Sequence, residues 1–235
     1  TLVSALTSAG ESTSTFYCSS QTNCSASNSL NFALATNINA SGFAGANVRR
    51  FGTSNAAYAG TFTGLGHTIT NLTLSGAGNV GMFYSTANGA AVRDLRLTDA
   101  SITGTGNYTG ALVGSAASSL TLTNVIMDGT SSVSNSASSY VGGLLGSAGS
   151  GTLSNIYVLT TNVTGAGYVG GVVGNGNMTV TNVHKVGTVT GAGANVGGAF
   201  GYMSGTMNNV DSVGNVTVTG NNSSVGGLVG DAGSS

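Results

Sequence analysis

Short apolar segments recur along the chain at regular intervals, separated by stretches rich in Gly, Ser, Thr and Asn. The clearest is a motif in which Val or Thr precedes one or two Gly and then two apolar residues. Its first glycine falls at positions 81, 110, 142, 170, 197 and 226, so neighbouring copies lie 27 to 32 residues apart. Repeats of this length are typical of solenoids, in which one repeat cannot bury its apolar face alone.

A polar position follows the same period. It is Asn in five copies and Asp in one, and Leu, Ile or Val always comes next. Stacked amides bond the amides above and below them. We therefore expect one ladder of hydrogen-bonded side chains along the repeats: Asn71, Asp94, Asn124, Asn155, Asn182 and Asn209.

A third segment places one Ile or Val between two small polar residues, the alternation of a half-buried strand. Five successive repeats contain it. On one shared face, the polar residues would form two rows along a flat, uncharged strip. These candidate recognition rows are Ser101 and Thr103, Ser132 and Ser134, Asn162 and Thr164, Thr188 and Thr190, and Thr217 and Thr219.

Three short strands in each repeat of about 29 residues predict an all-β fold, a parallel β-helix or β-solenoid. Stacked coils would lie about 4.8 Å apart, the spacing of hydrogen-bonded strands. We expect residues 1–59 to form N-terminal coils or a cap, and residues 60–235 to form the repeat solenoid.

The composition fits this architecture. The 40 glycines allow corners and close approaches between coils, and Pro is absent because it cannot donate within a central strand. Only five residues are basic, too few to neutralise a nucleic-acid backbone. The longest apolar runs have four or five residues, too short to cross a membrane. We expect neither nucleic-acid binding nor membrane insertion.

The repeats resemble the GLUG motif of large bacterial surface and secreted proteins, most closely in Val225-Gly226-Gly227-Leu228-Val229-Gly230. The stretch Gly60–Leu72, with Gly66-His67-Thr68-Ile69, is similar to the segment that precedes such repeats, except that Thr63 stands where Asp is common. Residues 30–42 resemble the upstream coil of the same family. The resemblance implies a right-handed parallel β-helix within a filamentous-haemagglutinin-like adhesin or another exported passenger.

The chain has two cysteines, Cys18 and Cys24, in a stretch rich in Ser, Thr and Asn. A nearby pair in an exported protein is most simply a local disulfide. Metal binding would require more ligands, and neither histidine is near in sequence.

Catalysis would require acids or a histidine converging on one point. The acids of the repeats differ in their offset from the asparagine ladder, and only Asp99 and Asp128 could lie close on consecutive coils. His67 is expected to make a structural hydrogen bond, and His184 to face solvent without an orienting acid. We therefore expect no enzymatic activity, no cofactor and no metal.

These observations favour a secreted or cell-surface bacterial adhesin or structural module that attaches to a glycan or protein on a host or neighbouring cell. Three alternatives stay open: an ice-binding solenoid that uses the Ser/Thr rows, a self-assembling extracellular filament, and a polysaccharide-processing enzyme. Only Asp231–Ser235 follow the last motif, so we also expect further chain or another subunit to cover the C-terminal coil.

Overall fold

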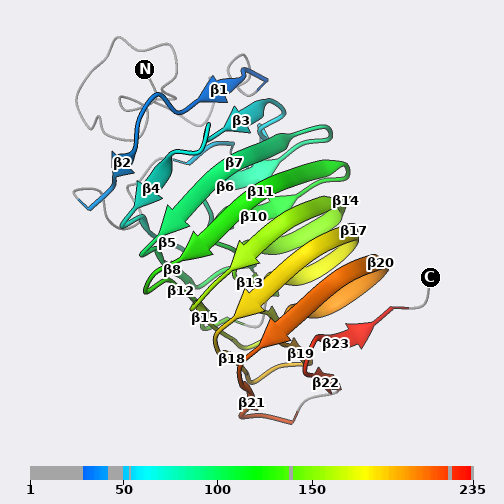
Figure 1. Ribbon diagram of the computed structural model, residues 1–235. Coiled ribbons are helices and arrows are strands. Elements are labelled where there is room, and N and C mark those ends of the chain that lie inside the picture. The colour runs from blue at the N-terminus through cyan, green and yellow to red at the C-terminus, as the bar shows by residue number, and fades with distance from the viewer. Residues whose placement is uncertain (1–28, 42–49, 53, 138–139, 222–223, 234–235) are drawn as a thin grey trace.

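The structure is a computed structural model that describes residues 29–41, 50–52, 54–137, 140–221 and 224–233. In this part of the chain every regular element is a β-strand, and neighbouring strands pair in parallel. The strands stack in successive coils along one axis, with the blue N-terminal strands at one end and the red C-terminal strands at the other (Figure 1). The prediction of an all-β parallel solenoid with coils of about 29 residues is confirmed.

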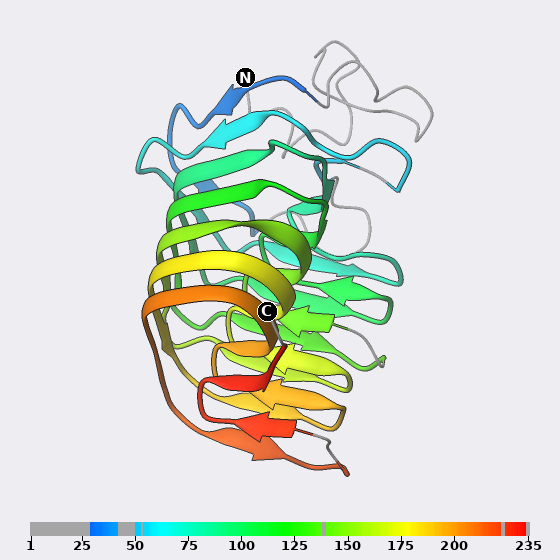
Figure 2. The ribbon, with the colours of Figure 1, turned by 90° about the vertical axis from the view of Figure 1, so that its right-hand side faces the viewer.

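Three sheets run along the solenoid, and a coil is one passage of the chain through all three (Figure 2). The six-stranded sheet contains β5 (Thr73–Gly76), β8 (Ser101–Gly104), β12 (Ser132–Asn135), β15 (Asn162–Gly165), β18 (Val189–Gly191) and β21 (Val216–Val218). The five-stranded sheet contains β9 (Tyr108–Thr109), β13 (Tyr140–Gly142), β16 (Tyr168–Gly170), β19 (Asn195–Gly197) and β22 (Ser224–Gly226).

The twelve-stranded sheet forms the broad face of the solenoid. Its main path contains β1 (Phe32–Ala33), β3 (Thr61–Thr63), β7 (Ala91–Thr98), β11 (Leu120–Asp128), β14 (Leu145–Val158), β17 (Val173–Val186), β20 (Phe200–Val213) and β23 (Val229–Ala232). Four short strands complete it: β2 (Ile38–Asn39), β4 (Thr68–Thr70), β6 (Phe83–Thr86) and β10 (Val113–Ala116). From β14 onward, the segments that are separate in earlier coils fuse into strands of 14 residues.

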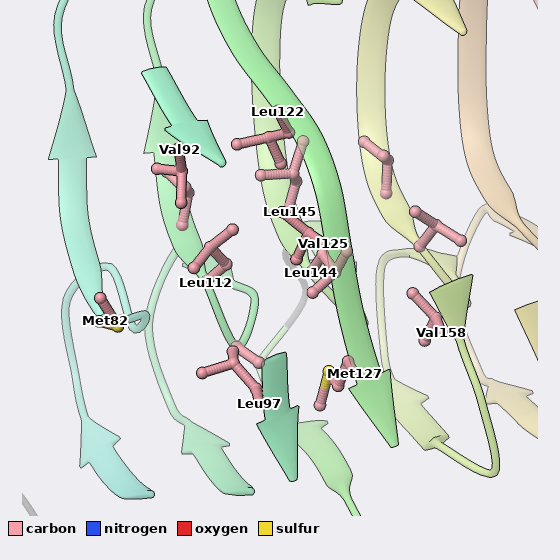
Figure 3. Close-up of a cluster of buried hydrophobic side chains, with 14 of the residues drawn as sticks. Met82, Val92, Leu97, Leu112, Leu122, Val125, Met127, Leu144, Leu145 and Val158 are labelled. Atoms are coloured by element: carbon pink, nitrogen blue, oxygen red, sulfur yellow. The ribbon is translucent and has the colours of Figure 1, made fainter. Parts of the chain in front are cut away.

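The core consists of apolar columns that run from coil to coil. One column in the twelve-stranded sheet is Val92, Leu122, Leu153 and Val180, and the next is Leu95, Val125, Ile156 and Val183. All eight side chains are fully buried, or nearly so. Figure 3 shows Val92, Leu122 and Val125 among the apolar side chains of the interior. Burying each such side chain contributes about 1.5–3 kcal/mol, so stacking the coils stabilises repeats that would not fold alone.

Aromatic rings fill the N-terminal end of the core. Phe51 stacks on Phe83 with ring centroids 5.0 Å apart and also contacts Tyr58 and Phe62. The Tyr58 hydroxyl donates to the carbonyl of Leu30 at 3.0 Å. Because β1 and β2 pair with β3 and β4, these first coils continue the same sheet. The division at residues 59 and 60 stays a prediction.

The last coil, by contrast, has no further coil on its outer side in the described part of the chain. Val213 and Val225 are 54% and 53% exposed, and Met207 is exposed as well. Val180 and Val196, which lie opposite Met207 and Val225 in the preceding coil, are buried. That further chain or another subunit covers this coil stays a prediction.

Candidate functional site

The six-stranded sheet carries the expected polar rows in register. Each strand places one aliphatic residue, buried in all but the last strand, between two outward polar residues, as Ile102 lies between Ser101 and Thr103. Strand β5 extends both rows by one coil. The first row is Thr73, Ser101, Ser132, Asn162, Thr188 and Asn215; the second is Ser75, Thr103, Ser134, Thr164, Thr190 and Thr217. We call these twelve residues the polar strip.

The last coil departs from the expected alignment. Thr217 lies opposite Thr190 in the second row, not opposite Thr188 in the first. Thr219 lies beyond the strand, where its amide donates to the carbonyl of Gly191 at 2.9 Å. The expected placement of this pair is therefore wrong by two residues. The reason is that Val216 and Val218 satisfy the same alternation, and Val216 is the residue that stacks on Val189.

Neighbouring coils bond to each other within the polar strip. The Thr188 hydroxyl lies 2.7 Å from the Asn162 side-chain oxygen, and the hydroxyls of Ser134 and Thr103 lie 3.5 Å apart. None of the twelve residues is charged. The strip can therefore offer hydrogen bonds at a regular spacing to a neutral partner or to ordered water.

The asparagine ladder is continuous over five coils. Each side-chain amide donates to the residue one coil closer to the N-terminus at 2.9 to 3.0 Å. The backbone is left-handed at every position, with φ between 53° and 55°. Asn and Asp tolerate this conformation better than other residues with a side chain. The ladder comprises Asp94, Asn124, Asn155, Asn182 and Asn209.

Asn71 does not lie in this ladder. Register pairs Thr70 with Thr98, which places Asn71 opposite Asp99. In that coil residues 64–67 lie at the level of Asp94 and Leu95, so Asn71 stands at the next corner, where Asp99 also has a left-handed backbone. Asn71 instead donates to the side-chain oxygen of Asn39 at 3.1 Å, and its backbone is also left-handed.

Asp99 and Asp128, the two acids that could lie close on consecutive coils, bind different partners. Asp128 binds Arg96, with the shortest nitrogen–oxygen distance 2.5 Å. Asp99 accepts hydrogen bonds from the amide and hydroxyl of Thr130, which lower the pKa of its carboxyl. Within the described residues, no three of His, Cys, Asp and Glu gather in a metal-binding group.

His184 has an orienting acid that was not expected. Its ring nitrogen Nδ1 lies 2.6 Å from the Asp211 carboxylate on the next coil, and both side chains are partly exposed. Tyr157 occupies the same column one coil earlier. His184 and Asp211 each lie two residues after a ladder asparagine, and this shared spacing could have indicated that the two side chains are neighbours. His67 lies 3.2 Å from the Asn37 side-chain oxygen through its Nδ1.

A lysine lies inside the core, and the pattern analysis missed it. Lys185 is 0% exposed and stands in the apolar column of Leu97, Met127 and Val158. Its ammonium donates to the carbonyl of Thr161 at 3.0 Å, and burial lowers its pKa to about 8. In earlier coils the third residue after the ladder residue is apolar, and this pattern could have indicated that Lys185 points into the core.

A column of tyrosines was also missed. Tyr108, Tyr140 and Tyr168 are in register on the five-stranded sheet and are half-buried. Rings of Tyr108 and Tyr140 stack with centroids 5.4 Å apart, and those of Tyr140 and Tyr168 meet edge to face at 4.9 Å. Each tyrosine directly precedes the Val or Thr that opens the glycine motif, so the period of the motif was a signal that could have revealed the column. We call these three residues the tyrosine column.

A second column lies on the strand that follows each glycine motif, on the short strands β6 and β10 and near the start of the long strands β14 and β17. It consists of Ser85, Ser115, Ser147 and Asn175, and we call it the facing column. A hollow of about 440 Å³ opens between the two columns at their N-terminal end, lined by Tyr84, Tyr108, Ser85, Ser115 and Asn107 among others. Further along, Tyr168 contacts the ring of Tyr202, which continues the facing column. The hollow therefore lies at the N-terminal end of the two columns, and at Tyr168 and Tyr202 the two columns meet.

Two further expectations concern the cysteines and membrane insertion. Cys18 and Cys24 fall outside the described residues, so their disulfide stays a prediction. The described chain contains no long apolar helix of the kind that crosses a membrane.

Comparison with known proteins yields one structural likeness. No protein-family model and no curated protein matches the chain. A crystal structure from Bacteroides ovatus, described as a "putative immunoglobulin A1 protease", is similar in fold. It aligns with a TM-score of 0.50 and 18% identity over 88% of this chain and 78% of that chain.

This likeness overturns the expectation that the chain is not an enzyme, because a protein with a similar fold is described as a protease. A solenoid architecture therefore gives no ground for excluding catalysis. At 18% identity the likeness shows the fold alone, and the activity in that description belongs to the Bacteroides ovatus protein.

Proposed function

We propose that the chain is a rigid attachment module of a secreted or surface-displayed bacterial protein. The observation that carries this proposal is the outer surface of the solenoid, where the same small polar or aromatic side chains return in register from coil to coil. The resemblance of the glycine motif to GLUG repeats of filamentous-haemagglutinin-like adhesins supports an exported bacterial origin.

Repetition explains how such a surface binds. Each coil contributes one weak contact, and a repetitive partner engages many of them at once, so the overall affinity exceeds that of any single contact. The coils are fixed by stacked cores and by the asparagine ladder, so little conformational entropy is lost on binding. The partner expected on this basis is a glycan or protein on a host or neighbouring cell.

Binding of the fluorescently labelled chain to intact cells tests this function. Epithelial cells and bacterial cells are incubated with labelled chain, and bound fluorescence is measured with and without excess unlabelled chain. We expect saturable binding that the unlabelled chain displaces. Signal that does not saturate, or that a charge-matched unrelated protein displaces equally well, would contradict the proposal.

The polar strip favours ice as a second candidate partner. Its two rows lie on one sheet, with coils about 4.8 Å apart and residues i and i+2 about 6.6 Å apart, so hydroxyls repeat in two directions. Ice growth in the presence of the chain measures this directly: thermal hysteresis that is lost in the Thr164→Val, Thr190→Val double variant supports ice binding. No hysteresis in the unaltered chain excludes it.

A further inference from the structure

We propose that the hollow beside Tyr108 binds a neutral sugar ring, which stacks on Tyr108 and pairs with the hydroxyl of Thr86. This inference rests on the proposed attachment function and gives it a site and a ligand class. The hollow is bordered by β6 and β10, whereas the polar strip lies on the six-stranded sheet, so the two surfaces can be tested separately.

The hollow lies where the tyrosine column ends. The bridge between Val80 and Thr109 places Asn79 opposite Tyr108 in the preceding coil. Tyr108 stacks on Tyr140 with ring planes only 11° apart, and no other ring of the described residues contacts Tyr108. Asn79 also lines the hollow and is smaller than the tyrosine that later coils have at this position. A ring-shaped ligand can therefore continue the stack beyond Tyr108.

Thr86 brings an unpaired polar group to the same hollow. Thr86 is among the residues that line it, yet its side chain is only 1% exposed. Its hydroxyl has no hydrogen-bond partner among the described residues. Leaving a buried hydroxyl unpaired is unfavourable, so a ligand that bonds it gains an interaction that the protein alone does not make.

The remaining lining fits a sugar. Ser115 and Asn107 add a hydroxyl and an amide, which both donate and accept, as sugar hydroxyls do. An aromatic ring such as Tyr108 presents an apolar face to the C–H groups of a pyranose. The volume of about 440 Å³ lies within the range of small-molecule sites, about 300–1,000 Å³. A wholly apolar ligand would leave the Thr86 hydroxyl unpaired.

The one charged group close to the hollow is already engaged by the backbone. No acidic or basic residue lines the hollow in the described part of the chain. Arg50 lies behind Tyr84, with its guanidinium carbon 5.8 Å from the centre of that ring. Its two terminal nitrogens donate to the carbonyls of Asn79 and Ser75. Recognition in the hollow therefore depends on neutral groups, which favours a neutral sugar over an acidic one.

Titration of the nitrogen-15-labelled chain with methyl glycosides, followed by nuclear magnetic resonance, tests this assignment. The neutral probes are methyl glucoside, methyl galactoside, methyl mannoside and methyl N-acetylglucosaminide; the acidic probe is methyl glucuronide. We expect at least one neutral probe to shift the amide signals of Tyr108 and Thr86 saturably. Tyr108→Ala should weaken this binding about tenfold. Asn79→Tyr, which places a ring in the hollow and extends the tyrosine column, should abolish it.

Asn79→Tyr keeps the test valid if Tyr108→Ala fails to fold. Thr164→Val, on the polar strip, is the control and should bind the probe as the unaltered chain does. No saturable shift with any neutral probe, unchanged binding in Asn79→Tyr, or tighter binding of methyl glucuronide than of every neutral probe would each overturn the proposal.

Thermal unfolding of Thr86→Val gives a readout that does not depend on the sugar chosen. Val keeps the shape of Thr and removes an unpaired hydroxyl, so this variant should melt no lower than the unaltered chain while binding the probe several-fold more weakly. Thr109→Val is the matched control, because Thr109 is equally buried but its hydroxyl accepts a 2.7 Å hydrogen bond from Asn135. It should melt lower. An equal fall in both variants would show that the Thr86 hydroxyl is structural and would overturn its assignment to the ligand.

The cell-binding assay separates this inference from the function on which it rests. If labelled chain binds cells but no neutral glycoside binds the chain, the hollow assignment fails and attachment stands. If a neutral glycoside binds beside Tyr108 but labelled chain does not bind cells, the hollow assignment stands and attachment fails.

Discussion

The side-chain amide of Asn155 donates a 3.0 Å hydrogen bond to the side-chain oxygen of Asn124 in the preceding coil. Both residues have a left-handed backbone with φ of 54°. One residue type therefore meets two requirements at this corner: it tolerates positive φ, and its side chain is both donor and acceptor along the solenoid.

Replacing Asn155 separates these two contributions. Asn155→Ala loses the amide and must hold an unfavourable φ, so we expect a loss of about 2–3 kcal/mol in the free energy of unfolding. Asn155→Gly keeps the backbone conformation and loses only the amide, so its cost should be about 1 kcal/mol. Urea denaturation measures both variants. Asn177→Ala, on a strand with ordinary φ, is the control; equal losses in the Ala and Gly variants would refute the explanation.

Buried Lys185 gives the stability a distinct pH dependence. Burial lowers its pKa from 10.5 to about 8, so below pH 8 the lysine is charged in both states and the cost of burying the charge is fully present. Between pH 8 and 10.5 the folded chain releases the proton that the unfolded chain retains. The free energy of unfolding should therefore rise with pH, by about 2 kcal/mol up to pH 10.

Urea denaturation at intervals from pH 7 to 10 measures this rise. Lys185→Met should remove it, because Met fills the same column without a titrating group. Arg93→Met, which removes an exposed positive charge, should retain it. Measurements stop at pH 10 because burial raises the pKa of Tyr58, whose ionisation in the unfolded chain lowers stability at higher pH. A parallel rise in Lys185→Met would show that another group is responsible.

Position 142 of the repeat motif requires glycine, because backbone atoms of neighbouring segments approach it closely. A Cβ there would overlap the carbonyl oxygen of Leu145 and lie 2.7 Å from the amide nitrogen of Gly174. We expect Gly142→Ala to cost more than about 3 kcal/mol, because backbone on both sides must move. Gly227, the second glycine of the last motif, has no atom within 4 Å of a Cβ built on it, so Gly227→Ala should be nearly neutral. Thermal unfolding compares the two; similar melting temperatures would contradict the packing account.

Much of the fold could be predicted from sequence because each repeat carries the same few constraints. Close approach fixes glycine at positions such as Gly142, and the left-handed corner fixes Asn at positions such as Asn155. Both constraints recur with the coil, so their spacing reveals the solenoid. Alternation is a weaker guide to register, because Val216 and Val218 satisfy it equally well. The structure shows that Val216 is the residue that stacks on Val189.

The sites that sequence analysis missed depend on which side a residue faces. Lys185 is polar by type but occupies an inward position, where its stem packs against Gly171 and its ammonium reaches Thr161. The pairing of His184 with Asp211 depends on side-chain orientation between coils, which spacing alone does not determine. Asn71 was misplaced because the corner that it shares with Asp99 is left-handed as well, so an Asn followed by Leu also fits this second corner of the coil.

Attachment itself is measured most directly with beads that carry the chain through one terminus. Beads are settled on layers of epithelial or bacterial cells, washed under flow and counted. The account predicts that beads with the unaltered chain are retained several-fold more than beads with Gly142→Ala, and that soluble chain reduces their retention. Equal retention of the two kinds of bead, unchanged by soluble chain, would contradict the proposal that this solenoid is an attachment module.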